Sequence, residues 1–225
     1  MTWRKAQKVS DGKTNKEYLS DEAFEYAQTY LARERRMLFL RGPIYPAPFP
    51  RNDPYGPSLI CDDLLAMNLE DSEKPIYLMI DSGGGLVSTG MNVYDYILMS
   101  KAPIVTIGHN IASMAVSIFI AGKKRLLLPH AQITLHLPEA AFKEESLDSK
   151  DMGIRAKQLD AIKDMIVGCY IDCGAHAGLK DKKRKQIHTQ ILKDIDREFN
   201  LTAQEAIDYG LADHIVTADE LYGGV

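Results

Sequence analysis

Short apolar runs alternate with amphipathic helical patterns through the middle of this chain, and this alternation constrains the fold most. Pro75–Ile80 (PIYLMI) and Ala102–Ile107 (APIVTI) are almost wholly apolar, which predicts two strands buried on both faces. Between them, Val87–Met99 carries a helical apolar stripe, and another helix is expected near residues 112–120. Strands and helices at this spacing predict β-α-β crossovers, and therefore an α/β fold with a mostly parallel sheet.

The flanking segments extend this pattern. Two more strands are expected at residues 124–128 and 133–137, because the intervening Pro129–Gln132 resembles a turn. A strand is also expected at 36–40, with helices at 26–35, 58–69, 183–194 and 202–209. Thr202 with Glu205 fits a capping box, and Gly210 fits the end of the last helix.

One helix is expected to be unusually long. Between Met152 and Cys173, apolar side chains recur at spacings of three or four, which predicts a helix of about six turns. Such a helix is longer than a compact domain needs for its own core. Part of its apolar stripe is therefore expected to meet another subunit.

Composition excludes several classes of protein. No apolar run approaches the roughly 20 residues that span a membrane, and the polar start lacks a secretory signal, so a cytoplasmic protein is expected. The net charge is −4, and the basic run Lys182–Lys185 is interpreted as a solvated helix start rather than a nucleic-acid surface. Cys169 and Cys173 are interpreted as structural, with no metal site.

Ser113 is the first candidate for chemistry. It follows a predicted buried strand and begins a predicted helix, at the sheet edge where α/β proteins place their sites. Amide N–H groups at the start of a helix could hold a developing oxyanion. The competing interpretation of Ser113 is a plain helix cap, and the local sequence alone favours that interpretation.

His136 and a glycine loop are the other candidates. Strand alternation puts His136 on the face opposite to Ile133 and Leu135, where it could face Ser113 across neighbouring strand ends. The loop Gly83–Gly85 allows close approach of backbone amides, but it matches neither of the common phosphate-binding glycine motifs. It is either a tight turn or one arm of an oxyanion hole.

Five motifs in order together resemble the proteolytic subunit of Clp protease, the ClpP family. They lie at Met37–Gly42 (MLFLRG), Ile76–Gly85 (IYLMIDSGGG), Ala112–Met114 (ASM), Leu135–Pro138 (LHLP) and Lys193–Asp213. The resemblance covers residues 26 to 216. It implies a ClpP/crotonase-type spiral of ββα units, with a handle region at about 139–175 that joins two heptameric rings.

The resemblance also implies roles for individual residues. Ser113 would be the nucleophile and His136 its general base, with the N–H groups of Gly85 and Met114 as the oxyanion hole. Glu198 falls at the family's third, aspartate position, and Asp194 and Asp196 are close substitutes. The substrates would be polypeptides. The chain itself would bind no cofactor, and ATP would be used by a partner AAA+ unfoldase.

The domain organisation is expected to be simple. Residues 1–25 form a divergent N-terminal segment, and residues 26–225 form a single domain with a Pro-rich insertion at 43–57. Two alternatives to an active peptidase remain. One is a non-catalytic ring subunit, and the other is a crotonase-type acyl-CoA enzyme, which would need an acidic general base.

Overall fold

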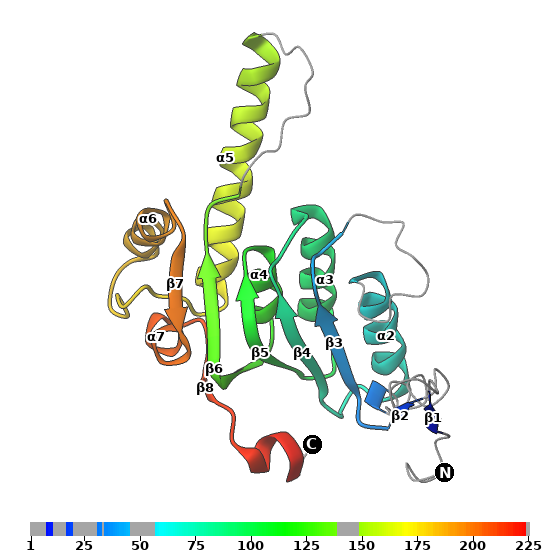
Figure 1. Ribbon diagram of the computed structural model, residues 1–225. Coiled ribbons are helices and arrows are strands. Elements are labelled where there is room, and N and C mark those ends of the chain that lie inside the picture. The colour runs from blue at the N-terminus through cyan, green and yellow to red at the C-terminus, as the bar shows by residue number, and fades with distance from the viewer. Residues whose placement is uncertain are drawn as a thin grey trace.

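A computed structural model describes residues 8–10, 17–19, 31–32, 34–45, 57–138 and 149–223 (Figure 1). The expected boundary between residues 25 and 26, most of the helix expected at 26–35, most of the Pro-rich insertion and the start of the handle region lie outside these residues. Near the start of the chain, β1 (Lys8–Ser10) and β2 (Glu17–Leu19) form a small antiparallel pair. No helix in the described part of the chain is both long and apolar enough to cross a membrane.

The main sheet has six strands. Its order is β3 (Met37–Arg41), β4 (Ile76–Ser82), β5 (Ile104–Ala112), β6 (Lys124–Leu135) and β7 (Phe199–Thr202), with β8 (His214–Ile215) also paired to β6. The pairs from β3 to β6 are parallel, β7 runs antiparallel to β6, and β8 runs parallel to it. This confirms the prediction of a mostly parallel sheet in an α/β fold.

Three helices cover one face of this sheet: α2 (Pro57–Glu70), α3 (Val87–Met99) and α4 (Met114–Ile120) (Figure 1). Every residue of α4 is buried, so α4 is the central helix of the layer. On the facing strand β4, Ile76, Leu78 and Ile80 are buried while the residues between them are partly exposed. This period of two brings the carboxyl end of β4 and the start of α4 against one core.

The remaining helices lie at one edge of the sheet. They are α5 (Ser149–Asp172), α6 (Arg184–Asp194) and α7 (Ala203–Tyr209), followed by the short helix η2 (Asp219–Gly223). Figure 1 shows α5 projecting well beyond the sheet, as the resemblance implies for a handle. Thr202 and Glu205 form the expected capping box on α7, which ends at Gly210 in the left-handed conformation.

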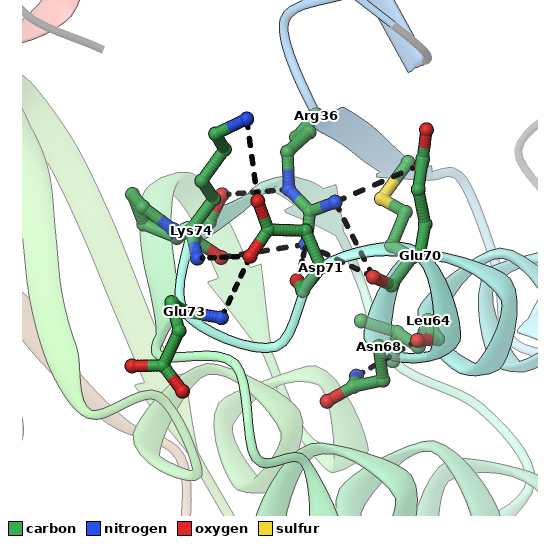
Figure 2. Close-up of polar contacts among 9 residues, drawn as sticks. Arg36, Leu64, Asn68, Glu70, Asp71, Glu73 and Lys74 are labelled. Atoms are coloured by element: carbon green, nitrogen blue, oxygen red, sulfur yellow. Dashed lines mark hydrogen bonds and ion pairs between the residues drawn. The ribbon is translucent and has the colours of Figure 1, made fainter.

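A buried arginine holds the end of α2 against the start of the sheet. The guanidinium of Arg36 donates hydrogen bonds to the carbonyl oxygens of Met67 (3.2 Å) and Asp71 (2.9 Å), and its Nε donates to Pro75 (3.2 Å) (Figure 2). Met67 lies in the last turn of α2 and its carbonyl also accepts from the N–H of Asp71 (3.0 Å), whereas Asp71 and Pro75 lie beyond the helix. Arg36 therefore ties the end of α2 to the segment that leads into β4 with one side chain.

Two predictions about strands need correction. Residues 124–135 form one strand, β6, rather than two strands separated by a turn. Gly108 pairs with Leu127 whereas Asn110 pairs with Gln132, so β6 advances five residues while β5 advances two. The extra residues are absorbed as an irregularity within the strand. In addition, no strand was expected at Phe199–Thr202, which forms β7.

Candidate active site

Ser113 lies at the turn between β5 and α4. Its amide N–H donates to the carbonyl of Thr134 (2.9 Å), which ties the turn to the neighbouring strand β6. Ser113 occupies the N-cap position of α4, but its hydroxyl makes no capping hydrogen bond. The helix-cap interpretation therefore leaves the side chain unexplained, because a capping serine is expected to accept from an N–H of the first turn.

The backbone at Ser113 is strained. Its φ is 56° and its ψ is −128°, and it is one of only three non-glycine residues with positive φ in the described part of the chain. Such conformations cost about 1–3 kcal/mol and cluster at active sites. The turn has the character of a strained strand-to-helix nucleophile elbow, although the G-x-S-x-G sequence of that motif is absent.

The glycine loop packs closely against this turn. A Cβ atom on Gly84 would lie 2.6 Å from both the carbonyl oxygen of Ala112 and the Cβ of Ser113, and its φ is +88°. On Gly85, with φ +148°, a Cβ would lie 2.2 Å from the carbonyl oxygen of Ile44. Glycine is therefore required at both positions so that the loop can lie between Ser113 and the segment that follows β3.

His136 comes directly after β6 and is half-buried. Its Nδ1 lies 2.8 Å from the carbonyl oxygen of Leu137. A carbonyl can only accept, so Nδ1 carries the proton in this contact, and in the neutral imidazole Nε2 is then the acceptor. This is the tautomer that a general base for a serine hydroxyl requires.

Ser113 and His136 line the same cavity. Its volume is about 340 Å³, and the glycine loop and Met114 also line it. The structure thus brings together four of the five site residues predicted from the sequence: Ser113, His136, Gly85 and Met114. Among the described residues that line the cavity, none carries a carboxylate, so these residues offer no acidic general base of the crotonase type.

Two backbone N–H groups are available at the cavity. Met114 is the first residue of α4, where an N–H has no intrahelical acceptor. Gly85 forms a bridge with Ile44, in which Ile44 bonds to the carbonyl of Gly84 (2.8 Å) and the N–H of Leu86 (2.9 Å). That pattern leaves the N–H of Gly85 itself on the other side of the loop, away from Ile44.

The fifth predicted residue, Glu198, directly precedes β7 and lies next to the pair that joins the end of β6 to β7, opposite His136. The last β6–β7 pair joins Leu135 to Phe199, and the next backbone contact joins the N–H of Leu137 to the carbonyl of Ile195 (3.2 Å). His136 therefore faces the bulged stretch 196–198. Glu198 is exposed there, and no hydrogen bond or ion pair within the described residues joins it to His136.

The alternative acids differ in their surroundings. Asp194 accepts hydrogen bonds from Gln190 Nε2 (2.6 Å) and from the hydroxyl of Tyr209 (2.9 Å), so its carboxylate already has structural partners. Asp196 is exposed in the same bulge as Glu198.

Sequence reasoning missed the groups at the inner end of the cavity. Ser117 follows Ser113 by one turn of α4, and Tyr170 comes from α5. A signal for Tyr170 was present, because it lies within the predicted long helix, four residues after the apolar Ile166. Leu137 contributes only its backbone carbonyl, which no side-chain pattern can reveal.

Comparisons with known proteins agree with this architecture. A sequence model of the family described as Clp protease matches residues 51–219. The ATP-dependent Clp protease proteolytic subunit 3 of Synechococcus sp. (strain CC9902) is 35% identical over 185 residues, which cover 81% of this chain and 82% of the relative. Subunit 2 proteins of Prochlorococcus marinus (strain MIT 9312) and Corynebacterium glutamicum are each 36% identical, covering 74% and 72% of this chain and 77% and 75% of those relatives.

Proposed function

The chain belongs to the Clp protease family, and we propose that it is a catalytically active serine endopeptidase subunit that cleaves unfolded polypeptides. The observation that carries this proposal is the backbone conformation and position of Ser113. Its backbone is strained, its hydroxyl has no capping bond, and it opens into one cavity with His136. Structural serines do not need that combination, whereas a presented nucleophile does.

The proposed reaction is acyl transfer through Ser113. Its Oγ attacks the peptide carbonyl carbon while Nε2 of His136 accepts the hydroxyl proton. The N–H groups of Gly85 and Met114 stabilise the oxyanion of the tetrahedral intermediate. When the C–N bond breaks, His136 returns the proton to the leaving amine, and an ester to Ser113 remains.

Water then completes the cycle. His136 removes a proton from the attacking water, the C–O bond to Ser113 breaks, and the serine oxygen regains a proton as the carboxylic acid product leaves. In this proposal Glu198 supports the imidazolium from the opposite strand.

Assembly and partners extend the proposal. We infer that copies of this chain form stacked heptameric rings through α5, and that a separate ATP-driven unfoldase supplies the polypeptide. The support is the exposed outer half of α5, together with the words "ATP-dependent" and "proteolytic subunit" in the names of the relatives. The chain itself needs no cofactor for the chemistry described above.

The test is labelling of the full chain by a fluorophosphonate probe, combined with hydrolysis of fluorogenic peptides. Wild type should be labelled at one site and should cleave peptide, and Ser113→Ala should lose both properties by at least about a thousandfold. Ser72→Ala is the matched control, because Ser72 lies in the loop before β4, at the end of that strand away from the cavity. Equal labelling of wild type and Ser113→Ala would overturn the proposal in favour of a non-catalytic ring subunit.

A further inference from the structure

The main sheet has a second apolar face, on the side away from α2, α3 and α4. Along β4, Leu78 and Ile80 belong to the core beneath those helices, whereas Met79 between them points the other way. Side chains of β5, β6 and the residue after β8 extend this outer face. Its members pack together as a separate apolar group: Tyr77, Met79, Val105, Ile107, Leu126, Leu128 and Val216.

The C-terminal helix η2 covers one end of this outer face. Leu221 of η2 is half-buried and packs against the apolar group. Figure 1 shows η2 (red) at the end of the sheet where β6 begins. The cover is partial, because Tyr77, Met79 and Leu128 keep some exposed surface with η2 in place. The apolar face is therefore larger than the segment that lies on it.

Glu220 fixes η2 to the start of β6. Its carboxylate accepts hydrogen bonds from Lys124 Nζ (2.9 Å) and from His214 Nε2 (2.7 Å). It also accepts from the backbone N–H of Thr217 (3.0 Å), and these donors, with Thr217 as the largest cause, lower the pKa of Glu220 to about 2. The acid and the leucine that follows it thus bind two adjacent features, a cation and an apolar face.

The attachment of η2 is weak enough to be reversible. A helix of five residues is too short to be stable by itself in water. The side chains of Lys124 and His214 are 47% and 42% exposed, so solvent screens their ion pairs with Glu220. Segments near a chain end that are held in this way open locally far more often than the strands of a core.

We propose that the outer face is a binding surface for a short protein segment in which an acidic residue precedes a leucine, and that residues 217–223 occupy it as a detachable C-terminal latch. When the latch is closed, Glu220 and Leu221 take the places of the partner's acid and leucine. When it opens, Lys124 and the apolar face become free for the partner. Latch and partner therefore compete, and the open fraction sets the apparent affinity for the partner.

Binding of the latch sequence as a separate peptide tests the inference. A fluorescein-labelled peptide with the sequence of residues 217–223 (TADELYG) is titrated into the full-length chain, and fluorescence anisotropy measures binding. Leu221→Asp should open the latch, because a carboxylate is not accommodated against the apolar face. The peptide should then bind at least about tenfold more tightly than to wild type. Ala218→Asp is the matched control, since it adds the same charge at an exposed position and should bind like wild type.

Lys124 tests the charged half of the surface. In the Leu221→Asp background, Lys124→Ala should weaken peptide binding by about threefold to fivefold, the value of an exposed ion pair. Lys123→Ala removes a neighbouring exposed cation and should have no effect. Equal affinity of wild type and Leu221→Asp, no binding to Leu221→Asp at about millimolar concentration, or equal effects of the two lysine substitutions would each overturn the proposal.

Hydrogen exchange of the unmodified protein gives a measurement that does not depend on the folding of any variant. The N–H of Leu221 donates to the carbonyl of Thr217 (3.0 Å) and should exchange at least about a hundredfold faster than the N–H groups of β6, because the latch opens without unfolding the sheet. Equal protection of η2 and β6 would overturn the latch. None of these measurements uses peptide hydrolysis, so an inactive Ser113 would overturn only the proposed function.

Discussion

At the scale of single residues, the least expected feature is that a backbone carbonyl, that of Leu137, holds the ring of His136. The carbonyl of Leu137 accepts from Nδ1 at 2.8 Å, a place that a carboxylate takes in a Ser-His-Asp triad. A backbone carbonyl can fix the tautomer and the ring orientation. It cannot supply the full negative charge that stabilises an imidazolium, so in the proposed mechanism an acid at the bulge opposite His136 would still have a role.

Replacing Glu198 by glutamine tests how the support of His136 is divided between the Leu137 carbonyl and an acidic side chain. We expect Glu198→Gln to lower kcat by about tenfold, far less than the roughly ten-thousandfold loss when the tautomer itself becomes wrong. The reason is that Leu137 continues to hold Nδ1–H after the charge is removed. Steady-state hydrolysis of a fluorogenic peptide measures the effect.

Asp196→Asn is the matched control, because Asp196 is an exposed acid in the same bulge. It should change kcat by less than a factor of about two, the usual result for a surface charge. A larger loss in Asp196→Asn than in Glu198→Gln would assign the third position to Asp196. A loss in Glu198→Gln as large as that in His136→Ala would mean that the Leu137 carbonyl does not hold the ring.

Much of the site could be predicted from sequence because its side chains occur in short motifs at strand ends. Ser113, His136 and the glycine loop all follow strands that the apolar pattern identifies. The strain at Ser113 could not be predicted, since it arises where the turn meets Gly84 and the carbonyl of Thr134. Such contacts join residues far apart in the chain, and local patterns carry no record of them.

At the scale of secondary-structure elements, Arg36 controls how α2 ends. Its guanidinium donates to the carbonyl of Met67 at the end of α2 and to that of Asp71 just beyond it, and the side chain is buried (Figure 2). We expect Arg36→Ala to lower the free energy of unfolding by about 3 kcal/mol, because several buried carbonyls lose their charged donor at once. Urea denaturation followed by far-ultraviolet circular dichroism measures the change.

Two further variants separate geometry from charge. Arg36→Lys keeps the charge but loses the planar fork, so its stability should lie between those of wild type and Arg36→Ala. Lys74→Ala should leave the denaturation midpoint almost unchanged, because the Lys74 side chain forms, among the described residues, only an exposed ion pair with Asp71 (3.2 Å), and its backbone contacts remain in the variant. If Arg36→Ala were no less stable than Lys74→Ala, the guanidinium would not be what holds the end of α2.

The two incorrect strand predictions have the same cause, because both strands depend on pairing with a neighbouring strand that is distant in sequence. Pro129 and its neighbours predict a turn, but the residues on both sides pair with β5, so the excess length is absorbed inside β6. Phe199–Thr202 is short and half polar, with Asn200 at its centre, and it becomes a strand only because β6 offers it a partner. Helices were predicted more accurately because their apolar spacing is a local property.

At the scale of the whole molecule, α5 joins two regions with different surroundings. From residue 150 to 165 none of its residues is buried, and even the apolar side chains of Met152 and Ile154 are more than half exposed. From Ile166 onward the helix packs on the core and contributes Tyr170 to the cavity. An isolated helical extension is only marginally stable in water, so the outer half is expected to pack against another copy of the chain.

Met152→Asp tests this expectation, since it places a charge on the apolar stripe of the exposed half. Sedimentation velocity should show that wild type forms double rings and that Met152→Asp shifts to smaller species, because an interface cannot bury an unpaired carboxylate. Gln158→Asp adds the same group on another side of the helix and should leave assembly intact. Peptide hydrolysis should fall with assembly, since the same helix positions Tyr170 at the cavity. A monomeric, active wild type would show instead that the cavity is complete within one chain.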